Sequence, residues 1–145
     1  MKLICKGHKG DEILNKKLQK VEDPLRCEGA LLLMGEVMCK EKGVGLAANQ
    51  VGLDQQLFIM APDGAIEYVI NPEIVKESRY TKEDYEACLS YPGITAKIAR
   101  PIAIIVNYHN GVEYVKERKL KDYAARVFLH EYDHLQGHCK VSDFI

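Results

Sequence analysis

The feature that most constrains this chain is the run His130-Glu131-Tyr132-Asp133-His134 near its C-terminus. Residues four apart on an α-helix lie on one face, with their Cβ atoms about 5–6 Å apart, so His130 and His134 can converge on one metal ion. Glu131 then lies beside the metal, where its carboxylate can take a proton from a water molecule whose pKa the metal lowers to about 7. The H-E-x-x-H pattern therefore predicts a helix that carries a catalytic metal site.

The flanking residues predict that this helix is buried and runs from about residue 122 to residue 136. Between Lys121 and Gln136 the apolar residues leave almost no polar face apart from the metal residues, which is typical of a buried helix. We expect Asp122 to cap its start and Gly137 to end it in the left-handed conformation. Ordinary hydrogen bonding of these side chains is the alternative, but only five histidines are present and two have this spacing.

A catalytic site of this type needs a third protein ligand, because it uses three and leaves one position open. One group of metalloproteases supplies a later histidine, but this chain has Lys140 at that position, and lysine stays protonated. None of the eleven residues after His134 is a glutamate. The third ligand must come from upstream or from the short tail, and the candidates are Cys5, Cys27, Cys39, Cys88, His109, His138 and Cys139.

Cys88 stands just ahead of a turn-rich segment, residues 90–93, that can present a thiolate. An isolated cysteine is more often a small buried hydrophobic residue, but beside two histidines it becomes a candidate ligand. His109, in an expected hairpin turn, and Cys139, too close to the helix end to reach back easily, are weaker candidates. Spacing alone leaves the choice open.

Residues 43–52 form a loop of small residues that contains one long amide, Gln50. A phosphate-binding role is disfavoured because the loop lacks a third glycine, a lysine and a preceding strand. It can be a tight turn after a helix. Alternatively, its glycines let an extended substrate backbone approach while Gln50 points an amide N–H at a developing oxyanion.

Length and composition indicate one soluble domain spanning residues 1–145. The net charge of −1 argues against nucleic acid as a partner, because no basic excess exists to neutralise phosphates. No apolar run is long enough for a signal peptide or a membrane span. Five cysteines without a C-x-x-C pair fit a reducing compartment, so we expect a cytoplasmic protein.

The remaining periodicity predicts an α+β fold. A helix is expected over residues 25–42, with Gly43 as its stop. Strand patterns follow at residues 56–60, 68–70, 73–78, 102–108 and 112–119, and Asn110-Gly111 predicts a hairpin between the last two. A helix, then antiparallel strands, then a buried helix is typical of the α+β class.

Three stretches, residues 43–50, 86–90 and 130–134, resemble the three signature motifs of peptide deformylases in order and in separation. The resemblance covers roughly residues 25–137. Members of that family remove the formyl group from the N-terminal methionine of newly made bacterial or organellar proteins. It implies an α+β fold with antiparallel sheets around a central metal-binding helix.

The resemblance also implies a role for particular residues. These are the metal ligands Cys88, His130 and His134, the general acid/base Glu131, the oxyanion donors Gln50 (side-chain amide) and Leu89 (backbone N–H), and the substrate-binding residues Val44, Gly45 and Val127. In the expected mechanism a metal-bound hydroxide attacks the formyl carbon, Glu131 passes the proton to the leaving amine, and formate is released. The family's usual metal is Fe²⁺, with Zn²⁺, Ni²⁺ or Co²⁺ as substitutes, although a thiolate with two imidazoles suits zinc equally.

Two departures from the family pattern matter. Ala87 replaces the usual glycine, so the backbone there must avoid positive φ. The sequence also lacks the C-terminal helix associated in the family with ribosome docking, as in short forms known from phages. We therefore expect a monomer that acts on N-formyl-methionyl nascent peptides and docks weakly on ribosomes.

Two other classes of protein fit parts of the pattern. A peptidase that cleaves internal peptide bonds would need a third histidine or glutamate ligand. A metal-stabilised binding module would have a closed site with four protein ligands, completed by Cys139 or His138. An open site keeps a water molecule on the metal, and the spectrum of the metal distinguishes the two arrangements.

Overall fold

The computed structural model describes residues 1–145 and has the expected α+β architecture. Its elements are the helices α1 (Glu28–Lys40) and α2 (Asp122–Leu135), the strands β1 (Gly45–Ala47), β2 (Leu57–Met60), β3 (Glu67–Glu77), β4 (Thr81–Ala87), β5 (Thr95–Pro101), β6 (Ala103–His109) and β7 (Tyr114–Lys121), and the 3₁₀ turns η1 (Asp11–Asn15), η2 (Pro24–Arg26), η3 (Ala48–Val51) and η4 (Lys140–Phe144). No helix has the length and the apolar character that spanning a membrane requires.

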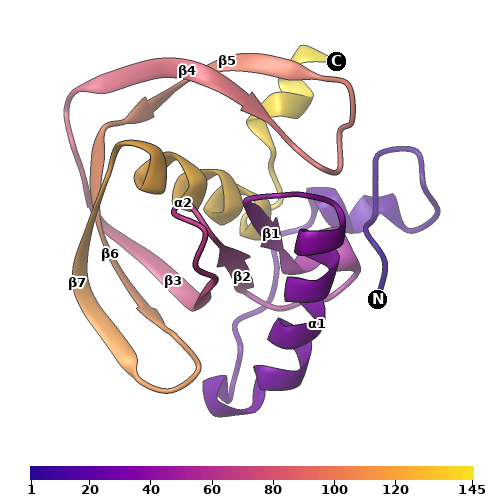
Figure 1. Ribbon diagram of the computed structural model, residues 1–145, viewed down its shortest axis with the longest axis horizontal. Helices are drawn as coiled ribbons and strands as arrows, with labels where there is room; N and C mark the ends of the chain where they lie inside the picture. Colours follow the sequence, from indigo (N-terminus) through magenta and orange to yellow (C-terminus); the bar gives the residue numbers. More distant parts are fainter.

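The strands form two antiparallel sheets around α2. Five strands pair in the order β1-β2-β3-β6-β7, and β4 pairs with β5 in a separate two-stranded ribbon. Figure 1 shows the β4–β5 ribbon passing over α2 while the larger sheet curves around its other side. Helix α2 packs against strands of both sheets, so it is the central element of the fold.

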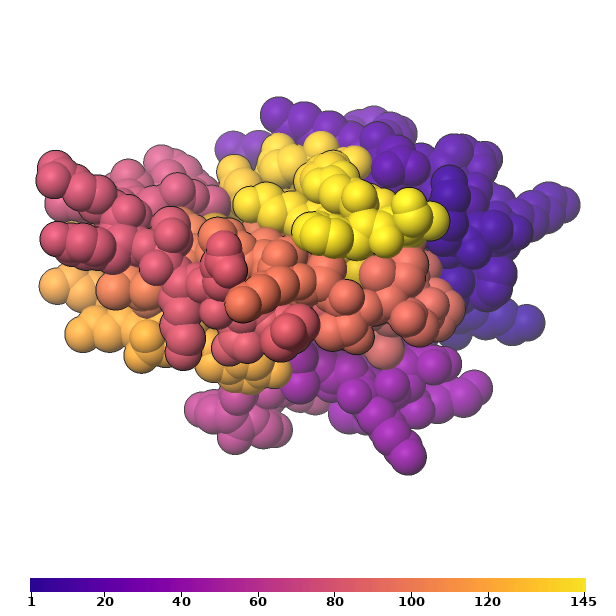
Figure 2. Space-filling view, turned by 90° about the horizontal axis from the view of Figure 1, so that it is seen from above, coloured from indigo at the N-terminus to yellow at the C-terminus, as the bar shows by residue number.

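The core is built on the apolar residues of α2. Phe128 is fully buried and packs edge-on against Phe58 of β2, with ring centroids 5.1 Å apart. Burying one such side chain contributes about 1.5–3 kcal/mol to stability. A smaller cluster, which includes Cys88, Cys139 and Val141, joins the C-terminal segment to β5. Figure 2 shows this segment lying on the surface beside the β4–β5 ribbon.

The first helix is shorter than predicted. It begins at Glu28 because Pro24–Arg26 forms a separate 3₁₀ turn, in which the Asp23 carboxylate accepts a hydrogen bond from the Leu25 backbone N–H. It ends at Lys40, and the chain leaves the helical conformation at Lys42, where φ is 58°. The predicted boundaries at residues 25 and 42 were wrong by two or three residues.

The second helix agrees closely with its prediction except at its first residue. Gly137 follows it with φ 85°, as expected. Asp122 is not the N-cap: Lys121 precedes the helix, and Asp122 is its first residue, with φ 53°. The Asp122 backbone N–H donates to the Ile102 carbonyl at 2.8 Å, because β7 runs directly into the helix without a loop.

The strand pattern was recovered in part. The two patterns at residues 68–70 and 73–78 are one strand, β3, with irregular register opposite β6. The hairpin around Asn110-Gly111 is confirmed. Strands β1, β4 and β5 were missed. In β4 only Glu86 is buried, so that strand shows no apolar alternation for a sequence pattern to detect.

Candidate metal centre

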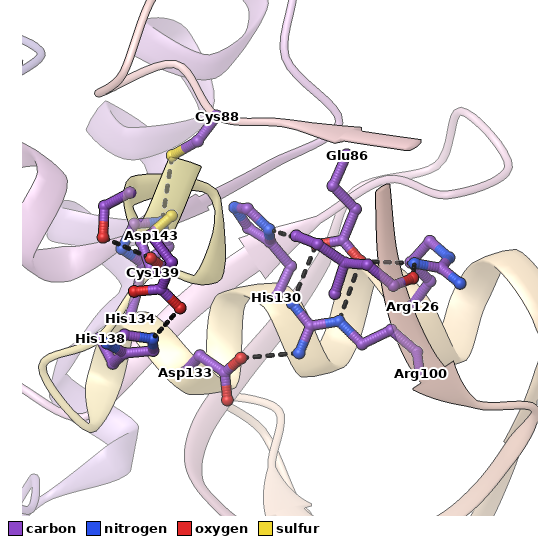
Figure 3. Close-up of polar contacts among 12 residues, drawn as sticks. Glu86, Cys88, Arg100, Arg126, His130, Asp133, His134, His138, Cys139 and Asp143 are labelled. Carbon is purple, nitrogen blue, oxygen red and sulfur yellow. Dashed lines mark hydrogen bonds and ion pairs between the residues drawn. The ribbon is translucent and has the colours of Figure 1, made fainter. Parts of the chain in front are cut away.

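Helix α2 and two turns bring four metal-binding side chains together. His130 and His134 project from one face of the helix with ring centroids 5.1 Å apart. Cys88 follows β4, and its Sγ lies 3.2 Å from Nε2 of His134. The ligand atoms of these three residues and of Cys139 all lie within 4.8 Å of one another, and all four residues are buried (Figure 3). Two thiols and two imidazoles are a ligand set that fits zinc, iron or cobalt.

His130 is oriented by a buried charge network. Its Nδ1 lies 2.9 Å from Oε1 of Glu86, which leaves Nε2 as the free metal-binding atom. Arg100 donates to both carboxylate oxygens of Glu86 at 2.9 Å, and Arg126 donates to Oε2 at 2.6 Å. Figure 3 shows Glu86 lying between the two guanidinium groups and His130.

The charges of this network shift the pKa values of Glu86 and His130. Burial alone would raise the pKa of Glu86, but hydrogen bonds from Arg100 and His130 hold it well below its ordinary value. Burial opposes charge on His130, yet the hydrogen bond to Glu86 raises its pKa to about 9. Glu86 is thus ionised and fixes the position of His130. The sequence reasoning assigned no role to Glu86, because its partners lie 14 and 40 residues away in the chain.

The Glu131 carboxylate is buried beside the cluster, and its Oε1 has no hydrogen-bond partner. Burial raises its pKa. Gly45 faces this carboxylate so closely that a Cβ at that position would lie 2.5 Å from Oε2 of Glu131. Any side chain at residue 45 would therefore displace the Glu131 carboxylate. A buried carboxyl group with a raised pKa is suited to accepting a proton and returning it.

Two N–H donors lie beside Cys88. The Gln50 amide accepts from the Ala47 N–H through Oε1 at 2.9 Å, and its Nε2 donates to Oγ of Ser90 at 3.0 Å. This fixes the amide orientation with Nε2 3.6 Å from Sγ of Cys88. The backbone N–H of Leu89 makes no hydrogen bond within the chain. Ser90 is a positioning residue that the sequence pattern did not reveal.

A pocket of about 480 Å³ opens next to the cluster. Eight of the nine residues predicted for the site line it, and His134 lies behind them, fully buried. The eight are Val44, Gly45, Gln50, Cys88, Leu89, Val127, His130 and Glu131. The methyl group of Ala87, which also lines the pocket, is accommodated as expected, because Ala87 ends β4 and is not among the residues with positive φ.

Of the other candidate ligands, only Cys139 belongs to the cluster. Cys5, Cys27, Cys39 and His109 do not belong to the cluster of ligand atoms. His138 is half exposed and pairs with Asp143 at 3.3 Å. Cys139 does belong to it, so the expectation that it lies too close to the helix end was wrong. Gly137, with φ 85°, reverses the chain directly after α2 and returns Cys139 to His134.

The two clustered thiols influence each other. Their mutual hydrogen bond, helped by His134, lowers the pKa of Cys139, and the same contact raises the pKa of Cys88. Cys139 is therefore the thiol of the pair that loses its proton more readily. A thiolate is the form of cysteine that binds metals.

Comparison with known proteins adds independent evidence. The sequence model of the family described as Polypeptide deformylase matches residues 2–144. A peptide deformylase of Thermotoga petrophila is 45% identical over 132 residues, covering 88% of this chain and 79% of that protein. The solved peptide deformylase of Thermotoga maritima is 39% identical with a TM-score of 0.89, covering 97% of this chain and 94% of that one. A probable peptide deformylase from Synechococcus phage S-SSM7 is 31% identical with a TM-score of 0.88, covering 99% and 98% of the two chains.

Proposed function

This chain belongs to the peptide deformylase family, and on that premise we propose how its own residues perform the reaction. The family consists of metal-dependent hydrolases, and the protein removes the N-formyl group from newly made polypeptides. We assign Cys88, His130 and His134 as the metal ligands of this reaction. The observation that carries the assignment is the convergence of their ligand atoms at the wall of the pocket.

A metal bound there would polarise the formyl group and lower the pKa of a water molecule to about 7. Glu131 is the proton carrier: its carboxylate takes a proton from that water and gives it to the nitrogen of the leaving amine. Its unpartnered Oε1 and its raised pKa support this role. Gly45 leaves the space that the carboxylate occupies.

The formyl oxygen gains negative charge in the transition state, and two donors lie where they can stabilise it. We assign this role to Nε2 of Gln50 and to the free backbone N–H of Leu89. Removing one such donor typically lowers kcat by about 10²–10³. Ser90 holds the Gln50 amide in place through the 3.0 Å hydrogen bond.

The peptide part of the substrate is assigned to the edge of the larger sheet. Strand β1 is an edge strand, so an extended peptide can bind alongside the backbone at Gly45. Val44 and Val127 line the same pocket and give apolar surface for a methionine side chain. Formyl is the smallest acyl group, so the close packing around Glu131 disfavours acetyl and longer groups.

We propose Fe²⁺ as the metal, with Zn²⁺, Ni²⁺ or Co²⁺ as substitutes, because thiolate and imidazole ligands accept all four. We also propose a single catalytic domain, a monomer and a cytoplasmic location. Weak ribosome binding fits the net charge of −1, which gives little attraction to ribosomal RNA.

The direct test is a deformylation assay on formyl-Met peptides, with the protein loaded with Fe²⁺ under anaerobic conditions. Formate release is expected from the formyl substrate and not from the matched acetyl-Met peptide. A second substrate with an internal peptide bond and a blocked N-terminus tests the peptidase alternative. Cleavage of that bond, without formate release from the formyl peptide, would contradict the proposal.

A further inference from the structure

The proposed reaction needs three protein ligands, but the structure brings a fourth ligand atom to the same place. The Cys139 sulfur lies within 4.8 Å of the ligand atoms of Cys88, His130 and His134. Cys139 is 2% exposed, so its side chain faces the protein interior. Nothing in the proposed chemistry of Glu131 or Gln50 uses this thiol.

The spacing of the four atoms fits one tetrahedral metal ion. With metal–sulfur bonds of about 2.3 Å and metal–nitrogen bonds of about 2.0 Å, tetrahedral ligand atoms lie roughly 3.3–3.8 Å apart. The Cys88 Sγ to His134 Nε2 distance of 3.2 Å is already close to that range. Because no two of the four ligand atoms lie more than 4.8 Å apart, the widest pair must close by about 1 Å at most.

Cys139 is held in this position by the fold. Its carbonyl accepts hydrogen bonds from the Ser142 backbone N–H at 3.0 Å and from the Ser142 hydroxyl at 2.6 Å. Gly137 packs so tightly on the N-terminal segment that a Cβ there would lie 2.7 Å from the carbonyl carbon of Lys16. Residues 140–144 lie against β5, as Figure 2 shows. The thiol is therefore preorganised, and little chain entropy is lost when it binds a metal.

We propose that Cys139 is a fourth, displaceable metal ligand, so that the resting site is a closed Cys₂His₂ site which opens for substrate. The proposal rests on the proposed function, because Cys88, His130 and His134 must be the other three ligands. Opening is a ligand exchange: the bond to the Cys139 sulfur breaks, a bond to an oxygen of water or of the formyl group forms, and no electron is transferred. The sulfur leaves as a thiolate with its electron pair, and the proton of an entering water still goes to Glu131. Cys139 thus retains the metal and restricts access to it.

The test uses the full chain loaded with Co²⁺, whose thiolate charge-transfer absorption reports how many sulfurs bind the metal. Cys139→Ser is compared with wild type and with the matched control Cys39→Ser, whose cysteine is exposed and lies outside the cluster. The absorption should fall to roughly half in Cys139→Ser, because one of two thiolates is lost, and stay unchanged in the control. Equal absorption in wild type and Cys139→Ser would overturn the proposal.

Two further measurements keep the test decisive. Azide should alter the cobalt bands of Cys139→Ser at a lower concentration than those of wild type, because in wild type it must first displace the Cys139 sulfur. Metal loss to a competing chelator should be about tenfold faster in the variant, in line with the usual effect of losing a metal-supporting group. Cys139→Ala should behave like Cys139→Ser, which excludes a serine oxygen as a replacement ligand. Azide binding equally to wild type would also overturn the closed site.

The same series separates this inference from the proposed function. Cys88→Ser should lose the metal, because Cys88 belongs to the set that the reaction needs. Metal kept by Cys88→Ser and lost by Cys139→Ser would contradict both, since Cys139 would then be a primary ligand. If no form of the protein releases formate while the cobalt absorption halves as expected, the proposed function fails and the fourth ligand stands.

Discussion

The two histidines of α2 are held in different ways. His130 is fixed by charge: Glu86 binds its Nδ1, and two buried arginines hold Glu86. His134 has no such partner, because its Nδ1 makes no hydrogen bond, and Asn49 contacts only its backbone carbonyl, at 2.7 Å. One side of the site is thus positioned by a polar network and the other by packing and the two thiols. We expect substitutions on the two sides to have different effects on stability and on metal affinity.

The largest effect is expected from Glu86→Ala on the charged side. It leaves Arg126 buried without a carboxylate partner and Arg100 with Asp133 alone, which should destabilise the protein by about 3–5 kcal/mol. Metal affinity should also fall by about 10–100-fold, because His130 loses its orienting partner. Denaturant titration and metal competition measure the two effects.

Glu83→Ala is the matched control for Glu86→Ala. Glu83 lies on the same strand but is exposed, and its ion pair with Lys97 spans 3.7 Å in solvent. Its loss should change stability by less than about 1 kcal/mol and leave metal affinity unchanged. An equal effect of the two variants would remove the distinction between the two sides of the site.

The contribution of Glu86 to stability should also depend on pH. The folded-state pKa of Glu86 lies below its ordinary value of 4.5, so its contribution is complete above that pH and is lost as the pH falls further. The stability difference between wild type and Glu86→Ala should therefore shrink below about pH 4.5. Denaturation curves recorded from pH 7 to pH 3 check this, and a constant difference would contradict it.

Glu131→Gln separates holding the metal from using it. Because Glu131 is not assigned as a ligand, the metal content should stay at the wild-type level. Deformylation should fall by about 10²-fold or more, since the amide cannot carry the proton. Metal analysis of the protein used in the assay provides the control. Retained activity would remove Glu131 from the proposed chemistry.

Asn49→Ala probes the packed side. It removes the hydrogen bond to the His134 carbonyl from a fully buried position, which should cost about 1–3 kcal/mol of stability. Metal affinity should change far less than in Glu86→Ala, since the His134 ring loses no partner. A comparable loss of affinity in both variants would show that the two histidines depend on their surroundings alike.

The smallest effect is expected from Ala87→Gly. The residue ends β4 just before Cys88, and its backbone is compatible with either side chain. Glycine should lower stability by at most about 1 kcal/mol, through the freer unfolded chain. Activity is expected to stay near wild type. A tenfold rise would mean that the methyl group distorts the position of Cys88.

The parts of this site that sequence could predict are those with local spacing. His130, Glu131 and His134 lie on consecutive turns of one helix, and the apolar pattern around them is long and continuous. Glu86 could not be assigned a role, because its charge and its position depend on arginines from β5 and α2, which are distant in the sequence. Strand β4 was hidden because its exposed charged residues show no apolar alternation. Cys139 was misjudged because one left-handed glycine decides the direction of the chain after α2.

The central position of α2 has a consequence for how the chain folds. Every strand that packs on this helix precedes it in the sequence. During synthesis the sheets are therefore made before Phe128 and its neighbours are available to cover them. Such a chain folds through long-range contacts that form late, and until then its apolar strand faces are exposed to aggregation. A protein that processes other nascent chains thus completes its own core only after α2 has been synthesised.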